Sequence, residues 1–301
     1  MPLWIPITIA AAFLQNLRSA LQRQLAQDLT ATSATYVRFL FGLPVALLYL
    51  WVLLATSDVR LPAPSAEFYV YAALGGVAQI VGTVLLVALF AHRNFVVGTT
   101  YSKTETVQTA LFGIFVFGES ITLGAGIGIA ISLVGVIAIS MARTEASPSA
   151  LITSFTERAA LMGLGSGAAY GVAAVCYRAG SLSLGMDGFL VPAAVTLAVV
   201  LTIQTLLMTG WLLWKDRTSL MATLKNWPAS LAIGVAGALG SIGWFTAMTL
   251  QNAAYVRALG QIELVFTFAV SWFWFREQAN AKEIAGVLLI IGGLVVLVLG
   301  T

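Results

Sequence analysis

The chain contains little charge and almost no cysteine or histidine. Only 9% of its 301 residues are charged, whereas 59% are hydrophobic. Its one cysteine, Cys176, excludes an internal disulfide, and its one histidine, His92, excludes a metal site built from clustered histidines. The fifteen basic residues form no run, so the net charge of +3 does not indicate a nucleic-acid surface. The sequence therefore predicts no metal site, no cofactor and no nucleic-acid partner.

Nucleotide-binding and catalytic motifs are also missing. The stretches GLGSGAAYG and GAGIGIAISLVG imitate dinucleotide loops, but both lie inside apolar segments with no strand before them. No Walker sequence is present, and no Ser–His–Asp or paired-carboxylate arrangement with enzymatic spacing stands out. Glycine spacings such as Gly163–Gly167–Gly171 favour close helix approach instead. We therefore expect neither an enzyme nor a pump that hydrolyses ATP.

Long apolar runs dominate what the sequence does contain. The mean hydropathy is +0.95, and a soluble domain of this size could not bury so much apolar surface. A helix needs roughly twenty apolar residues to cross a bilayer core of about 30 Å, and ten segments qualify. The N-terminal stretch MPLWIPITIAAAFL has no basic residue before it, so we interpret it as the first membrane helix and not as a signal peptide. The expected spans are 3–25, 32–55, 67–91, 94–117, 120–140, 158–180, 187–213, 227–250, 252–275 and 280–300.

The two halves of the chain repeat each other without a gap. Glu105 falls on Glu263, 158 positions later, and the same offset pairs further polar residues and glycines. Because each half holds five expected helices, an odd number, the second copy must enter the membrane from the opposite side. The fold class predicted is an all-α membrane protein of ten helices in two inverted repeats, 1–141 and 158–301, joined by a loop at 142–157. The other matched pairs are Asn94–Asn252, Thr109–Thr267, Phe115–Phe273, Glu119–Glu277, Gly128–Gly286 and Gly135–Gly293.

The pattern resembles a known transporter family. Ten helices in two repeats, with ETVQTALFGIFVFGES matching IELVFTFAVSWFWFREQ, are similar to the EamA-type family of the drug/metabolite transporter superfamily. The resemblance implies a secondary transporter and covers nearly the whole chain. Many members carry proline just after the mid-helix acid, where this chain has Thr106 and Leu264. The resemblance therefore does not predict a proline kink here.

Four charges in the expected fourth and ninth helices need an explanation. Lys103 and Glu105 stand near the middle of one, and Arg257 and Glu263 lie in the other. An ionised group at the bilayer centre costs at least about 2.5–3.5 kcal/mol, so these side chains must face protein or water. Residues two apart point about 200° apart on a helix, so Lys103 and Glu105 need partners elsewhere. The set could bind both ends of a zwitterion or exchange a proton; alternatively, it forms salt bridges that only fix packing.

Weaker candidates complete the expected substrate- or proton-binding set. Arg38 could guide an anionic group or extend to the interface. Gln79 and Gln261 are polar points in apolar surroundings, where a hydrogen bond between helices competes with ligand contact. Tyr101 and Trp244 could line an aromatic wall, although plain packing is the alternative. Glu119 and Glu277 stand at junctions into the next helix, where a structural role at the helix dipole is favoured. His92 beside Arg93 suggests an interfacial pair.

The predicted function is secondary active export of small metabolites such as amino acids, by alternating access across a bacterial plasma membrane. Alternatives are proton-coupled efflux of cationic drugs and a membrane scaffold without transport. The expected partners are a zwitterionic or amphipathic substrate, membrane lipid and protons, with a monomer or homodimer as the assembly. Basic residues number nine in loops after odd helices and two, Arg60 and Arg178, after even ones, which places both termini outside the cytoplasm. The family resemblance implies the opposite orientation.

Overall fold

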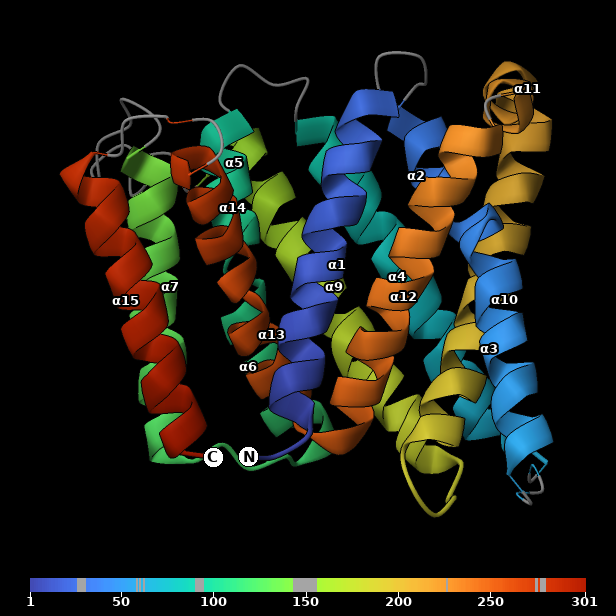
Figure 1. The fold of residues 1–301 in the computed structure, drawn as a ribbon, viewed down its shortest axis with the longest axis horizontal. Coiled ribbons are helices and arrows are strands. Elements are labelled where there is room, and N and C mark those ends of the chain that lie inside the picture. Colours follow the sequence, from blue (N-terminus) through green and yellow to red (C-terminus); the bar gives the residue numbers. More distant parts are fainter. Residues whose placement is uncertain are drawn as a thin grey trace. The chain divides into compact units, whose positions relative to one another are not determined.

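The chain is an all-helical membrane protein. The computed structural model describes residues 1–25, 31–57, 59, 61, 63–89, 95–142, 156–225, 227–273, 276 and 280–301 (Figure 1). The predictions for His92, Arg93 and Glu277 lie outside these residues. Within them, 8 helical stretches are long and apolar enough to cross a membrane. They are Thr35–Thr56, Ala66–Leu89, Leu123–Ala142, Arg158–Ser183, Leu190–Lys215, Trp227–Leu250, Ala253–Phe273 and Ala281–Leu299.

Three of the expected membrane segments are each built from two helices. The second expected segment contains α2 and α3, the fourth contains α5 and α6, and the ninth contains α13 and α14. A short helix that the hydropathy did not indicate, α11, follows α10. The helices are α1 (Trp4–Leu25), α2 (Ala31–Leu40), α3 (Gly42–Thr56), α4 (Ala66–Leu89), α5 (Phe95–Ser102), α6 (Glu105–Phe117), α7 (Leu123–Ala142), α9 (Arg158–Ser183), α10 (Leu190–Lys215), α11 (Arg217–Lys225), α12 (Trp227–Leu250), α13 (Ala253–Gly260), α14 (Ile262–Phe273) and α15 (Ala281–Leu299).

The chain divides into two compact units. The first unit consists of Met1–Ile80 and Cys176–Gln251, and the second consists of Val81–Val175 and Asn252–Thr301. Each unit therefore draws on both halves of the sequence. α4 and α9 each give one end to the first unit and the other end to the second.

Close helix packing organises the first unit. Glycines of α12 lie against α1, and a Cβ atom added at Gly243 would stand 2.8 Å from the Cβ of Ala11. Gly237, earlier in α12, faces Arg18, later in α1, so the two helices are antiparallel. Lipid tails are as apolar as leucine, so small residues that bring backbones together supply much of the attraction between membrane helices.

Arg178 binds the end of a neighbouring helix in the first unit. It lies inside α9, and its guanidinium donates hydrogen bonds to the carbonyl oxygens of Met248 and Gln251, each at 2.8 Å. Met248 lies in the last turn of α12 and Gln251 directly follows the helix, where helix hydrogen bonding leaves acceptors unsatisfied. The prediction that Arg178 is a loop charge is therefore wrong, and it adds nothing to the charge bias between loops.

The second unit contains the antiparallel pair α7 and α15, which lie side by side in Figure 1. A Cβ atom at Gly128 would stand 2.5 Å from the backbone nitrogen of Leu297. A Cβ atom at Gly135 would stand 2.7 Å from the carbonyl oxygen of Gly286. Residue numbers along α7 therefore increase in the direction in which those along α15 decrease, so the two helices are antiparallel. The two helices are equivalent in the sequence repeat, and opposite directions for equivalent helices are what an inverted repeat requires.

The start of α7 is capped by a residue that the sequence analysis did not select. The hydroxyl of Thr122 accepts a hydrogen bond from the backbone nitrogen of Ala125 at 3.1 Å. The carboxylate of Glu119 lies against Gly113 of α6, where it would stand 2.9 Å from an added Cβ. Threonine is a common residue at helix N-termini because its hydroxyl can accept such a bond.

Candidate functional site

The fourth membrane segment is interrupted where its charges stand. α5 ends at Ser102 and α6 begins at Glu105, which leaves Lys103 and Thr104 between them. The backbone nitrogens of Lys103 and Thr104 donate to carbonyl oxygens three residues earlier, each at 3.1 Å. Such bonds tighten one turn and interrupt the regular α-helix. Lys103 therefore projects from a helix junction and not from a straight helix.

Hydroxyl side chains stabilise this junction. The Oγ1 of Thr104 donates to the carbonyl oxygen of Tyr101 at 2.6 Å, and Ser102 donates to that of Thr99 at 2.8 Å. The amide of Gln108 donates to Thr104 Oγ1 at 2.7 Å. Backbone groups freed by a break in a membrane helix must be satisfied by protein, and short hydroxyl side chains can do so. A break without proline is thereby accounted for.

The ninth segment is interrupted in the equivalent place. α13 ends at Gly260 and α14 begins at Ile262, with Gln261 between them. The backbone nitrogen of Gln261 donates to Ala258 O at 3.0 Å, which is again a tightened turn. Both segments thus break near the acid even though neither has the family's proline. The polar run SKT and the pair Gly260–Gln261 are the sequence signals that could have indicated these breaks.

Glycines of α9 make room for the first junction. A Cβ atom at Gly163 would overlap the carbonyl oxygen of Gly98, and one at Gly167 would stand 3.0 Å from that of Ser102. The glycine spacing noted in the sequence therefore brings α9 into backbone contact with α5 and the junction. Side chains at these two positions would displace the residues that carry Lys103.

Each charge lies at the helix end that favours its sign. Glu105 is the first residue of α6 and Glu263 is the second of α14, where the helix dipole is positive. Arg257 lies in the last turn of α13, and Lys103 follows the last residue of α5, where the dipole is negative. Each junction thus carries a base on its N-terminal side and an acid on its C-terminal side. The backbone contributes to holding four charges in an apolar chain.

The four charges form two crossed ion pairs within the second unit. The ammonium of Lys103 lies 3.2 Å from Glu263 Oε1, and the guanidinium of Arg257 contacts Glu105 Oε1 directly. Each base therefore pairs with the acid of the other broken segment, and neither pairs with the nearer acid in its own. The Lys103 side chain keeps 37% of its surface accessible and that of Glu105 keeps 15%. The pairs are partly enclosed but not sealed inside the protein.

A neutral hydrogen bond accompanies the ion pairs. The amide nitrogen of Gln261 donates to Thr106 Oγ1 at 2.8 Å, which joins the second junction to the first turn of α6. Gln261 is only 8% exposed, and its Oε1 has no hydrogen-bond partner among the residues that the structure describes. A buried acceptor left unpaired costs about 1–3 kcal/mol, so this atom is available to a donor that enters the cluster.

The arrangement can exchange partners at small net cost. Two acids and two bases cancel in charge, and breaking a buried ion pair without replacement costs about 3–5 kcal/mol. A molecule that brings its own positive and negative groups can replace those lost contacts. A ligand with one charge would leave an uncompensated group behind unless a proton moved with it.

The remaining predicted residues fall in both units. Tyr101 lies in α5, close to the first junction, and Gln261 lies at the second junction. Both belong to the second unit. Arg38, Gln79 and Trp244 belong to the first unit, in α2, α4 and α12 respectively. Trp244 is 8% exposed, and Arg38 and Gln79 line a pocket. The nine candidates therefore do not form one cluster within a single unit.

Comparison with known families decides the class of the protein. The model of the EamA-like transporter family matches residues 2–141 and 157–299. The chain belongs to this family. EamA-like proteins are transporters and not enzymes, and two family repeats cover nearly all of the chain. The resemblance to the drug/metabolite transporter superfamily, expected from the sequence, is confirmed.

Individual relatives of this EamA-like transporter are distant. It is 35% identical over 80 residues to the "Pseudopaline exporter CntI" of two Pseudomonas aeruginosa strains. That match covers 27% of the chain and 28% of the relative's length. A solved crystal structure is similar across 98% of this chain and 96% of its own, with a TM-score of 0.74 and 16% identity. At that identity the structural match establishes the fold alone.

Proposed function

We propose that this EamA-like transporter exports a small zwitterionic or amphipathic metabolite, such as an amino acid, by alternating access. We assign it to the plasma membrane of a bacterium. A relative is named as an exporter of a metabolite, which supports outward transport of an organic molecule. The observation that carries the proposal is the crossed pairing of Lys103 with Glu263 and of Arg257 with Glu105 at two helix junctions.

The proposed mechanism is an exchange of ion pairs. The substrate's ammonium binds Glu105 or Glu263, and its carboxylate binds Lys103 or Arg257. Broken helices place such groups at membrane depth in many transporters, with the dipole ends favouring the charges they hold. Because the four side chains satisfy one another's charges, substrate binding replaces one set of contacts with another of similar strength. The resulting moderate affinity allows the substrate both to bind on one side of the membrane and to be released on the other.

A second candidate is proton-coupled efflux of a cationic compound. In this mechanism one acid binds the cation or a proton in turn, and the bases only hold the acids in place. The observation that favours it is the presence of an acid at both junctions, Glu105 and Glu263, in equivalent positions of the repeat. Two acids related in this way could serve the two access states alternately.

Single neutral variants distinguish the two mechanisms. Flux of a panel of amino acids and organic cations is measured in proteoliposomes, with and without a pH gradient, for Lys103→Gln and Glu105→Gln. We expect equal losses of amino-acid flux, on the order of a hundredfold, because each variant removes one end of the zwitterion site. Cation flux that survives Lys103→Gln but not Glu105→Gln would instead establish proton-coupled efflux. An absence of flux for every compound would contradict both.

A further inference from the structure

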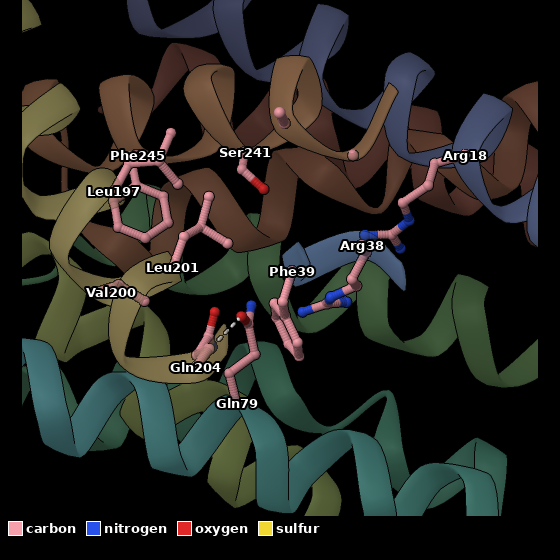
Figure 2. Close-up of a pocket in the computed structure, with 12 residues that line it drawn as sticks. Arg18, Arg38, Phe39, Gln79, Leu197, Val200, Leu201, Gln204, Ser241 and Phe245 are labelled. Atoms are coloured by element: carbon pink, nitrogen blue, oxygen red, sulfur yellow. Dashed lines mark hydrogen bonds between the residues drawn. The ribbon is translucent and has the colours of Figure 1, made fainter. Parts of the chain in front are cut away.

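We infer that the first unit contains a second binding site, for a carboxylate that has an N–H donor beside it and an apolar body. The site is a pocket lined by polar residues from α1, α2, α4, α10 and α12 and by apolar ones from α2, α10 and α12 (Figure 2). It shares no residue with the charge cluster of the second unit, and the inference goes beyond the function proposed above. The polar and aromatic lining residues are Arg18, Arg38, Phe39, Gln79, Gln204, Ser241 and Phe245.

Two guanidinium groups give the pocket its charge preference. Arg18 and Arg38 both line it, and its twelve lining residues include no acid. The guanidinium carbon of Arg38 lies 4.6 Å from the centre of the Phe39 ring, a cation–π contact that helps to hold it. Arginine presents several N–H donors in a planar fork, which matches the two oxygens of a carboxylate. Two like charges beside one pocket favour an anion between them.

Gln204 supplies the opposite function, that of an acceptor. This side chain is fully buried in α10, and its amide nitrogen donates to Gln79 Oε1 at 2.8 Å and to Gly76 O at 3.1 Å. Because both partners are oxygens, the hydrogen-bond network fixes which end of the amide is nitrogen. The other end, Oε1, has no hydrogen-bond partner among the described residues. In Figure 2 it points into the space below Leu201.

An unpaired buried acceptor indicates a missing donor. Leaving such an oxygen dry is unfavourable, and a ligand N–H would satisfy it. In the view of Figure 2, the two arginines lie on one side of the pocket and Gln79 and Gln204 on the other. An α-amino acid head has a carboxylate for the first side and an N–H group for the second. The rings of Phe39 and Phe245 offer apolar contact to its side chain.

The pocket is nearly closed in this state. The space around the lining amounts to about 330 Å³, part of it open to the outside, but very little of it is wide enough to hold water. That part has room for about one water molecule. Arg18 and Arg38 are partly exposed, whereas Leu197 and Gln204 are fully buried. Entry of a ligand therefore requires the two arginine side chains to move, while the glutamine side of the pocket is already formed.

The test uses three compounds that differ by one group. Calorimetry measures the binding of L-phenylalanine, phenethylamine and 3-phenylpropionate. Phenethylamine lacks the carboxylate, and 3-phenylpropionate lacks the N–H donor. The protein is the full chain in phosphatidylcholine nanodiscs. It carries Lys103→Gln, Glu105→Gln, Arg257→Gln and Glu263→Gln, so that neither ion pair of the second unit can supply the signal. We expect L-phenylalanine to bind at least about tenfold more tightly than phenethylamine and more tightly than 3-phenylpropionate.

Variants then assign the signal to the pocket. Arg38→Gln is expected to weaken L-phenylalanine binding about tenfold or more, and Arg38→Lys less, because lysine keeps the charge but loses the fork. Arg217→Gln, at an exposed residue of α11, is the control and should change nothing. Equal affinity for L-phenylalanine and phenethylamine, or no effect of Arg38→Gln, would overturn the inference. So would a signal that disappears in phosphatidylglycerol nanodiscs, because a lipid phosphate would then be the occupant.

The two proposals can fail separately. Loss of L-phenylalanine binding when only the four charges of the cluster are neutralised would overturn the pocket and leave the zwitterion mechanism of the second unit standing. Binding that depends on Arg38, in a protein that moves no compound across proteoliposomes, would support the pocket and contradict the transport mechanism.

Discussion

A chain that carries Glu105→Gln and Arg257→Gln together is expected to fold as the wild type does and to transport its substrate at least about a hundredfold more slowly. Removing both members of a buried ion pair is often close to neutral for stability, whereas removing one leaves a charge without compensation and costs about 3–5 kcal/mol. Glutamine retains hydrogen-bonding groups at both positions. Function is lost because neither end of the substrate finds its charged partner.

Two measurements on the same preparations check this expectation. Thermal unfolding in detergent should give a midpoint for the double variant near that of the wild type, and a lower one for Arg257→Gln alone. Flux in proteoliposomes should be lost in the double variant, while Arg217→Gln, as the control, retains it. If the ion pair only fixes packing, the double variant will keep both the flux and the unfolding midpoint of the wild type. The functional assignment of this pair would then be wrong.

The second large effect concerns the packing of α7 on α15. Gly128→Ala would place a Cβ atom 2.5 Å from the backbone nitrogen of Leu297 and 2.7 Å from the carbonyl oxygen of Gly293. Neither atom can move without moving its helix, so the two helices must separate. Overpacking of this kind costs about 1–3 kcal/mol. We expect a lower unfolding midpoint and a lower yield of folded protein.

Matched controls lie on the same two helices. A Cβ atom at Gly126 or at Gly292 would meet nothing within 4 Å. Gly126→Ala should therefore be neutral or stabilising by up to about 1 kcal/mol, because alanine is the better helix former. Gly292→Ala against Gly293→Ala repeats the comparison on α15, where a Cβ at Gly293 would stand 2.5 Å from the backbone of Ser132. Equal stability of Gly128→Ala and Gly126→Ala would contradict the packing of these helices and, with it, their antiparallel arrangement.

The main features of the fold were predictable because they depend on composition and on rare residues. Apolar runs locate the helices, since only a helix satisfies its own backbone in lipid. Glu105 and Glu263 stand out because charge is scarce in this chain, and their equal positions in the two halves indicate the repeat. The partners of Lys103 and Glu105 were expected on other helices, and the crossed pairs lie there. For these features local chemistry was sufficient.

The helix junctions and the pocket depend on contacts between distant segments. Without proline, nothing local requires a break at Lys103; hydroxyl groups and the backbone contacts at Gly163 and Gly167 accompany it. Arg18 looks like an ordinary charge toward one end of α1, and Gln204 is a single polar residue in an apolar run. Only the fold brings them to one pocket. A lone buried glutamine in a membrane helix is a usable signal, but it does not reveal its partners.

The central claim is that the charges at the helix junctions face an aqueous space that a substrate can enter. It is tested most directly by the reaction of Lys103→Cys with a membrane-impermeant methanethiosulfonate in proteoliposomes. Glu263→Gln is included to avoid an unpaired carboxylate, and the native Cys176, only 3% exposed, serves as the internal background. We predict modification at position 103 well above that background, slowed by transported substrate. A cysteine there that stays unmodified from both sides of the membrane would contradict the account.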